Sequence, residues 1–402
     1  MLTMDILGDL FQNIPVYHGG DEHKYFDCNN ESVMLHISNT SKQEYDNYLL
    51  LLEEAGFKLF DSNTIRDNYF ATYTRSSLVL QVYHTAHDKV TRVVADPKTA
   101  LYNRTKDSTF EKICDTVMYQ LELDYRNIDC GMCYVIQCAD HSFFIIDSAH
   151  MFSSNDHNRL YNLLRKLTPE GEKIIISGWF FTHAHQDHIA MFMSFLEADF
   201  ENCQIERLYY NFPALDIPGS EKWKELDKET MREFDQLIEN HSEIQVVKLH
   251  TGQRFFVKNL EFEVLATHED IYPASLGYFN DSSTILLMTV DGCKTLLLGD
   301  SNYTECTILV SRYGSYLKSD IVQVAHHGYN ASNVGVYFCA DAKVSLYSTP
   351  LKRYEQIKST SSNKVIHEIS EEIYIAENGT ASLKLPYTPG SAVVFPKEIN
   401  DI

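Results

Sequence analysis

The sequence lacks the features that direct a chain into or across a membrane. No run approaches the roughly 20 apolar residues that a transmembrane helix requires. The segment from Met1 to Tyr17 contains Asp5 and Asp9 but no Lys or Arg, so it lacks the basic start of a signal peptide. These absences predict a cytoplasmic protein without membrane contact.

Basic residues are also few. The chain has 34 Lys and Arg against 56 Asp and Glu, a formal net charge of −22. Because proteins bind duplex nucleic acid broadly by neutralising its phosphates with cations, this balance predicts no broad duplex nucleic acid binding. A small phosphoester is not excluded, since bound metal ions supply local positive charge.

The cysteines do not form the pattern of a disulfide framework. There are nine, an odd number, spread from Cys28 to Cys339, which is typical of a reducing compartment. The single CxxC pair, Cys130 and Cys133, lacks the second pair that a zinc ribbon needs, and it leads into a strand rather than a helix. We therefore interpret both as structural thiols.

A chain of 402 residues is long for one core, so we expect two domains. Residues 1–125 are predicted to form a small α+β domain of unknown role, with a strand at 33–37, an amphipathic helix at 43–55 that Gly56 ends, and strands from Tyr69 to Asp96. A helix from Ser108 to Gln120 is expected to link it to the second domain. We favour packing or homodimer formation as its role over substrate recognition.

Residues 126–402 show strand pairs separated by helices. The predicted strands lie at 134–137, 143–146, 173–182, 245–249, 255–258, 262–266, 284–290 and 295–298, and the predicted helices at 156–167 and 231–239. Tyr209 to Phe212 could line a pocket, although core packing is the more frequent use of such rings.

Three histidines and one aspartate lie in the run His183-Ala184-His185-Gln186-Asp187-His188. The run follows the carboxyl end of a buried strand, where open α/β sheets generally place chemistry. Imidazole and carboxylate suit zinc and similar divalent ions. His183 and His185 point the same way from an extended segment and can share one ion, whereas Asp187 and His188 begin a turn into a helix and can reach a second ion beside it.

With Thr182 in front, this run resembles the HxHxDH motif of the metallo-β-lactamase superfamily. Two later segments are similar to further motifs of that family and occur in the same order, namely Leu296-Leu297-Leu298-Gly299-Asp300 and Val324-Ala325-His326-His327-Gly328. The resemblance covers about Asp129 to Pro386. It implies an α/β fold, the αββα metallo-β-lactamase sandwich, with the metals at one edge of two packed sheets.

A narrower resemblance is to the branch that includes the hydrolase domains of DNA-uptake channel proteins and phosphorylcholine esterases. It is carried by Asn280-Asp281-Ser282-Ser283, Gly299-Asp300 and His326-His327-Gly328. The segment from Glu371 to Leu385, with Gly379-Thr380 in a hairpin, is similar to the closing strands of that branch.

The resemblance implies a role for each matched residue. His183 and His185 would bind a first ion, Asp187, His188 and His327 a second, and Asp300 both. Most of the superfamily has a third histidine for the first ion where this chain has Asn280. An amide oxygen or a water would then complete that site, with His268 as the alternative ligand.

Two further residues have open roles. His326 is expected to donate to the anionic oxygen of a substrate or to act as a general acid, and the alternative is a histidine held by hydrogen bonds beside the ligands. Asp147 follows a strand and would orient ligand imidazoles, unless it is an ordinary turn aspartate.

These observations predict a metal-dependent hydrolase with a small, anionic substrate. Two divalent ions, zinc first with manganese or iron as alternatives, would lower the pKa of water towards 7 and direct hydroxide at the substrate, with Asp187 and His326 as catalytic residues. Phosphoesters are favoured, because the narrower resemblance includes phosphodiester cleavage.

Other functions stay open from the sequence. Lactones, thioesters and amides are alternative substrates of the same fold. A metal-containing binding or scaffold protein is the alternative from another class. Redox chemistry on a di-iron site would need an acidic ligand in place of Asn280 and a flavin-binding domain, and neither is evident.

Overall fold

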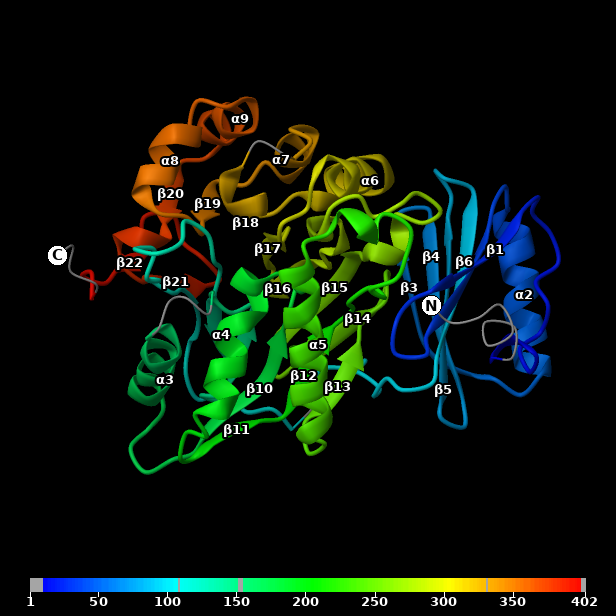
Figure 1. Ribbon diagram of the computed structural model, residues 1–402, viewed down its shortest axis with the longest axis horizontal. Helices are drawn as coiled ribbons and strands as arrows, with labels where there is room; N and C mark the ends of the chain where they lie inside the picture. Colours follow the sequence, from blue (N-terminus) through cyan, green and yellow to red (C-terminus); the bar gives the residue numbers. More distant parts are fainter. Residues whose placement is uncertain (1–9, 108, 151–154, 330–331, 399–402) are drawn as a thin grey trace.

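The computed structural model describes residues 10–107, 109–150, 155–329 and 332–398. Three β-sheets organise these residues (Figure 1). The amino-terminal strands form a six-stranded sheet that stands beside two larger sheets of nine and seven strands. The larger sheets pack face to face, with helices on their outer sides.

The amino-terminal domain is a small α+β unit, as predicted. Its antiparallel strands follow the order β1-β2-β6-β5-β4-β3, and one helix packs on the sheet through Tyr45, Tyr48 and Leu52. Ser41 and Glu44 form a capping box that fixes where this helix begins. The elements are β1 His23–Asp27, β2 Val33–Ile37, α2 Lys42–Glu54, β3 Lys58–Ile65, β4 Asn68–Arg75, β5 Leu78–Thr85 and β6 Val90–Asp96.

The predicted helix from Ser108 to Gln120 is wrong. Ser108 lies outside the described residues, and the segment ends in strand β7 (Thr116–Gln120), which pairs with β8 on one side and β21 on the other. Pairing with two distant strands outweighs the local helical spacing. The nine-stranded sheet therefore begins at Thr116, ahead of residue 126, where the sequence placed the start of the second domain.

The two larger sheets and their helices form the predicted αββα sandwich, which confirms the fold class. Helices α3 to α5 cover the nine-stranded sheet and α6 to α9 cover the seven-stranded sheet (Figure 1). Within the described ranges, no helix has the length and apolar character that crossing a bilayer requires.

The strands of the nine-stranded sheet after β7 are β8 Tyr134–Gln137, β9 Phe143–Ile146, β10 Ile174–Phe180, β11 Cys203–Ile205, β12 Arg207–Tyr210, β13 Gln245–Lys248, β21 Ala381–Leu385 and β22 Val393–Val394. Those of the seven-stranded sheet are β14 Arg254–Val257, β15 Leu260–Ala266, β16 Ile285–Val290, β17 Cys293–Leu297, β18 Ile321–Gln323, β19 Val344–Tyr347 and β20 Glu372–Ile375. The helices are α3 Asp156–Leu167, α4 Gln186–Glu197, α5 Glu225–Asn240, α6 Tyr303–Tyr313, α7 Gly335–Ala340, α8 Leu351–Ile357 and α9 Ser361–Ile369.

Aromatic rings fill the space between the two larger sheets. Phe144 and Phe262, one from each sheet, have ring centroids 4.6 Å apart, and those of Tyr209 and Phe255 are 5.1 Å apart. Such ring pairs stabilise a core beyond the area they bury. Tyr209, Tyr210 and Phe212 are buried, so core packing is the correct interpretation of that aromatic segment.

The predicted hairpin around Gly379 is wrong. β20 pairs with β19 in the seven-stranded sheet, whereas β21 pairs with β7 in the nine-stranded sheet. The chain crosses between the sheets at Gly379, which has a φ of 114° that favours glycine. The turn residues Gly379 and Thr380 therefore connect β20 and β21 without pairing these two strands with each other.

Buried charges join the amino-terminal sheet to the sandwich. Arg312 of α6 donates to Asp270 Oδ1 at 2.6 Å and to Asp88 Oδ2 at 2.8 Å. Arg92 of β6 donates to the backbone oxygens of Asp270 and Tyr272, both at 3.1 Å. Arg312, Arg92 and Asp270 are buried, so removing one partner would leave an uncompensated charge in the interface.

Arg312→Met should lower the free energy of unfolding by about 3 kcal/mol, because it leaves Asp270 buried without its closest cation. Denaturant unfolding measures the change. Arg254→Met is the control, since Arg254 pairs with Glu261 at the surface and its loss should cost less than about 1 kcal/mol. Equal losses in the two variants would contradict a structural role for the buried pair.

A second buried group in the same interface predicts a dependence on pH. His250 lies 2.7 Å from Glu269 and 3.4 Å from Asp96 of β6. Burial opposes the charged ring, but Glu269 and Asp96 outweigh it and raise the pKa of His250 to about 9. The stability from this raised pKa is complete below about pH 6.5 and is lost as the pH rises through about 9.

The free energy of unfolding should therefore fall between pH 7 and 9 by an amount on the order of 1–3 kcal/mol. In His250→Asn this fall should be smaller, because the titrating ring is gone. Denaturant unfolding at a series of pH values measures both slopes. A slope that His250→Asn leaves unchanged would show that another group causes it.

Candidate metal centre

The histidine run connects the end of β10 to the start of α4. His185 is the N-cap of α4 with extended φ and ψ of −67° and 149°, and Asp187 lies in the first turn. The positive end of the helix dipole favours a carboxylate there. His183 is therefore presented from extended chain and His188 from the helix, so the run can serve two neighbouring centres.

Six of the predicted side chains come together in two groups that share one carboxylate. Ligand atoms of Asp187, His188, Asp300 and His327 all lie within 4.8 Å of one another, and so do those of His183, His185 and Asp300. Asp300 is the member common to both groups. The other residues of each group come from loops that follow β10 and β18 and from the first turn of α4.

Distances within the groups suit shared ions. His327 Nε2 lies 3.0 Å from Asp187 Oδ2, and His188 Nε2 lies 3.3 Å from Asp300 Oδ1. Three of the ligand atoms are buried and form no hydrogen bond with the described residues, namely His188 Nε2, His327 Nε2 and Asp300 Oδ1. Buried imidazole and carboxylate atoms aimed at a common point fit a divalent cation such as zinc.

The second nitrogen of several rings is held by another group. His188 Nδ1 lies 2.7 Å from Asp147 Oδ2, and His327 Nδ1 lies 2.9 Å from the carbonyl oxygen of Ser348. His185 Nε2 faces Asp227 Oδ2 at 3.6 Å. Such contacts fix ring orientation and leave the other nitrogen for an ion.

Asp147 has the contacts of an orienting residue rather than of an ordinary turn aspartate. It is fully buried, and it also accepts hydrogen bonds from the backbone N and the Oγ1 of Thr182, both at 2.7 Å. These bonds connect the ends of β9 and β10 directly behind His188. The carboxylate therefore holds the start of the histidine run in place.

Backbone strain also marks the site. His326 and His327 have positive φ values of 50° and 53°, which non-glycine residues rarely adopt. Gly299, with a φ of 55°, lies so close to Thr182 that a Cβ atom at this position would be 2.9 Å from the Thr182 Cβ. Strain of this kind is concentrated at functional sites.

Asn280 lies beside the first group, where the sequence placed it. Its Nδ2 is 3.1 Å from Asp300 Oδ2 and 3.3 Å from His185 Nδ1. A 180° rotation of the amide would present its oxygen instead. His268, the alternative ligand, begins a short helix after β15, is buried against Tyr272 and belongs to neither group.

The electrostatics keep the rings of the first group neutral. Burial lowers the pKa of His183 well below its ordinary value. At His188 burial acts in the same direction, but the carboxylates of Asp300, Asp147 and Asp187 outweigh it and raise the pKa. A cation bound between these groups would replace a proton as the partner of the carboxylates.

A cavity of about 330 Å³ opens onto both groups. His326 lines it, with Nδ1 3.2 Å from Asn302 Oδ1 and Nε2 4.0 Å from Asp300 Oδ2. Because the Asn302 amide donates its Nδ2–H to Asp281 at 2.9 Å, its oxygen must face His326. The proton of a neutral His326 therefore sits on Nδ1, and Nε2 faces the cavity.

Several residues of this cavity were missed in the sequence. His150, Lys224, Asp227 and Tyr329 line it from separate segments, so no short motif contains them. Cys130 also lines the cavity, and burial together with nearby Asp187 raises the pKa of its thiol. Cys133 is buried, whereas Cys130 is partly exposed and lies at the candidate site.

No protein-family model matches this chain. No curated protein matches its sequence. Among solved structures it is similar to the metallo-β-lactamase fold protein YhfI from Bacillus subtilis, with 13% identity over 67% of this chain and 100% of that one and a TM-score of 0.40.

Two further solved structures are similar to a comparable extent. Yeast PDE1 has 13% identity over 68% of this chain and 100% of its own, with a TM-score of 0.42. Zn²⁺-bound PqqB from Methylobacterium extorquens has 9% identity over 67% of this chain and 100% of its own, with a TM-score of 0.41. At such identities the substrate or metal of a similar structure says nothing about this chain, so its function has to be inferred from the geometry of this site.

Asp147→Asn should weaken metal binding about 10- to 100-fold, because it removes the carboxylate that orients His188. Competition against a chromogenic chelator measures the affinity, and circular dichroism checks the fold. Asp341→Asn, which alters a half-exposed carboxylate paired with Lys318 and Lys343 away from the site, is the control. Unchanged affinity in correctly folded Asp147→Asn would contradict the orienting role.

Proposed function

We propose that this protein is a metal-dependent hydrolase that uses two divalent ions to cleave a phosphoester. The observation that carries the proposal is the membership of Asp300 in both donor groups. A carboxylate shared in this way supports two adjacent ions, the arrangement with which two-metal enzymes stabilise the attacking and leaving oxygens of a displacement.

Each donor group has its own members. His183, His185 and Asp300 would hold one ion, with the Asn280 amide oxygen or a water beside them. Asp187, His188, His327 and Asp300 would hold the other. Zinc is the ion that these ligands suit first, with manganese or iron as alternatives. When bound, such ions lower the pKa of water and offset negative charge on oxygen.

The remaining chemistry belongs to the side chains of the cavity. Asp187 Oδ2, 3.0 Å from His327 Nε2, is positioned to accept a hydrogen bond from an attacking water as well as to hold an ion. His326 Nε2 faces the cavity and would donate to an anionic oxygen of the substrate when it carries a proton. Asn302 positions His326 by accepting its Nδ1–H.

A phosphoester is the substrate class that this charge arrangement supports best. Two adjacent cations match the negative charge that a phosphoryl group carries in its transition state. The sequence resemblance to phosphorylcholine esterases supports the same class. Lactones, thioesters and amides carry less charge, and they serve as the competing substrates in the test.

The test combines metal analysis with a substrate panel. Protein purified without added metal is assayed for bound zinc, manganese and iron. It is then tested against bis(4-nitrophenyl) phosphate, a lactone, a thioester and an anilide. Metal-dependent cleavage of the phosphodiester alone is the expected result. Cleavage of a carbonyl substrate in its place would overturn the phosphoester assignment, and no cleavage with both ions bound would favour a binding or scaffold protein.

Asp187→Ala should reduce phosphodiester turnover by more than 100-fold while leaving the fold intact. The loss of a metal ligand lowers activity more than the 10- to 100-fold effect of losing a residue that only orients a ligand. Initial rates at a verified metal content measure the change. Glu197→Ala removes an exposed carboxylate at the other end of α4 and should leave the rate unchanged. Near-normal turnover of metal-loaded Asp187→Ala would refute its role.

The two ions should bind unequally, because Asn280 is a poorer zinc ligand than imidazole and leaves the first group with three strong donors. Metal titration should show one tight and one weak equivalent. Asn280→His should tighten the weak equivalent. Two equivalents of equal affinity in the unmodified protein would show that another donor completes the first group.

A further inference from the structure

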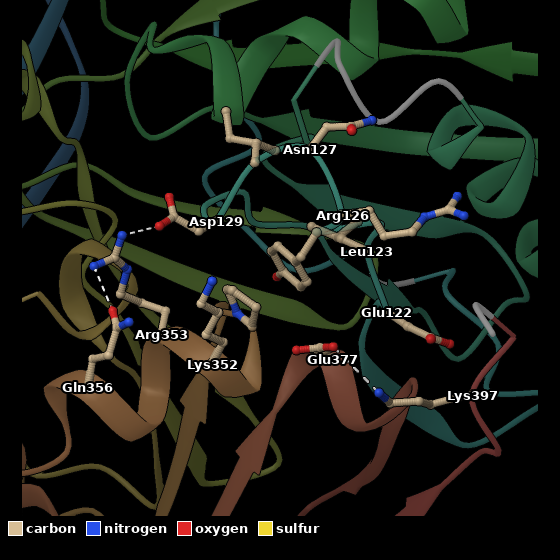
Figure 2. Close-up of a pocket in the computed structure, with 13 residues that line it drawn as sticks. Glu122, Leu123, Arg126, Asn127, Asp129, Lys352, Arg353, Gln356, Glu377 and Lys397 are labelled. Carbon is tan, nitrogen blue, oxygen red and sulfur yellow. Dashed lines mark hydrogen bonds and ion pairs between the residues drawn. The ribbon is translucent and has the colours of Figure 1, made fainter. Parts of the chain in front are cut away.

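A second and larger cavity has a volume of about 580 Å³, and Figure 2 shows the residues that line it. It lies between residues 122–129, the start of α8 and the carboxy-terminal residues Glu377 and Lys397. Ile128 lines both cavities, and Cys130 of the metal cavity follows Asp129 of the second one. A molecule longer than the metal cavity would therefore extend into this space.

Arg353 and Tyr329 form the boundary between the two cavities. The guanidinium of Arg353 lies 5.1 Å from the centroid of the Tyr329 ring, and it forms an ion pair with Asp129. Arg353 also donates to Gln356 Oε1 at 3.1 Å. Arg353 lines the second cavity and Tyr329 lines the metal cavity. Their contact therefore holds in place the side chains beside which a molecule that occupies both cavities would lie.

The second cavity contains four cationic side chains, three of which pair with protein carboxylates, and one further carboxylate, Glu122, also lines it. Arg126 pairs with Asp124, Arg353 with Asp129, and Lys397 with Glu377 at 3.5 Å. Lys352 makes no ion pair with any residue that the structure describes. Figure 2 shows its ammonium group directed into the cavity.

An unneutralised cation stands out in a chain with a net charge of −22. The overall charge repels anions, whereas the exposed ammonium group of Lys352, which lines a concave site, attracts them locally. Next to Lys352 the cavity has apolar surface from Leu123, Tyr125, Ile128 and Pro350, against which carbon atoms can pack. Apolar surface beside a cation lets the carbon atoms of a bound organic anion pack while the cation holds its charge.

We propose that this second cavity binds a second anionic group, a carboxylate or a phosphate, on the non-reacting part of the substrate, and that Lys352 recognises it. The reacting phosphoester would lie at the metal centre, so the inference rests on the proposed function. It narrows the substrate to phosphoesters that carry another negative charge beyond the reach of the metal ions.

Anion binding to metal-free protein tests the cavity independently of catalysis. In metal-free protein the carboxylates of the metal cavity lie beside Lys224 and the histidines, so a variant of Lys352 has to identify the part of anion binding that belongs to the second cavity. Ligand-observed NMR relaxation with inorganic phosphate and with succinate gives the two dissociation constants and separates the two anion types. Lys352→Glu should raise the dissociation constant of the more tightly bound anion at least about 3- to 10-fold.

The matched control is Lys358→Glu, which makes the same charge change at the end of α8, where Lys358 pairs with Glu355 outside the cavity lining. It should leave both dissociation constants within about twofold. Equal weakening in the two variants would overturn the proposal, because it would assign the effect to net charge. Unchanged affinity in Lys352→Glu would overturn it as well.

Kinetics then connect the cavity to the substrate. One chromogenic phosphodiester without a second charge is compared with one that carries a carboxylate on its alcohol part. Lys352→Glu should raise KM for the carboxylated substrate about 3- to 10-fold, leave its kcat within about twofold, and change neither constant for the other substrate. An unchanged KM would overturn the role of Lys352 while the hydrolase function stands. If neither ester is cleaved, the hydrolase function fails, and the NMR result alone decides whether the cavity binds anions.

Discussion

Two carboxylates and four imidazoles, most of them buried, lie within a few ångströms of one another, and the local structure of the sandwich edge is organised around that constraint. Asp187 and Asp300 cannot both remain charged in a buried site without cations or donors beside them. His188 and His327 face both carboxylates, while their other nitrogens are held by Asp147 and by the Ser348 carbonyl. A divalent cation satisfies the same atoms without requiring protonated rings.

The two-sheet architecture is what brings these groups together. His183 follows β10 of the nine-stranded sheet, whereas Asp300 and His327 follow β17 and β18 of the seven-stranded sheet. Because the sheets pack face to face, the loops at one edge of both meet. The aromatic core between the sheets therefore sets the separation of the two halves of the site as well as the stability of the domain.

The amino-terminal domain is fastened to the sandwich by buried ion pairs but contributes nothing to either cavity among the described residues. Every lining residue of the metal cavity and of its larger neighbour lies at or beyond Glu122. The segment between the domains continues into the sandwich as β7, whose pairing with β21 joins early and late parts of the chain.

The sequence by itself determined the elements that depend on neighbouring residues. The period of apolar residues located α2, α3 and most strands, and the histidine run with its two later partner motifs indicated both the fold class and the residues that meet at the sheet edge. Tertiary structure alone decided what depends on distant partners. β7 forms because two distant strands flank it, β20 and β21 separate because each completes a different sheet, and Asp227 faces His185 because α5 packs beside α4. Tertiary structure alone also decided the cavity around Lys352. Its walls come from segments more than two hundred residues apart, so no local sequence pattern could predict it.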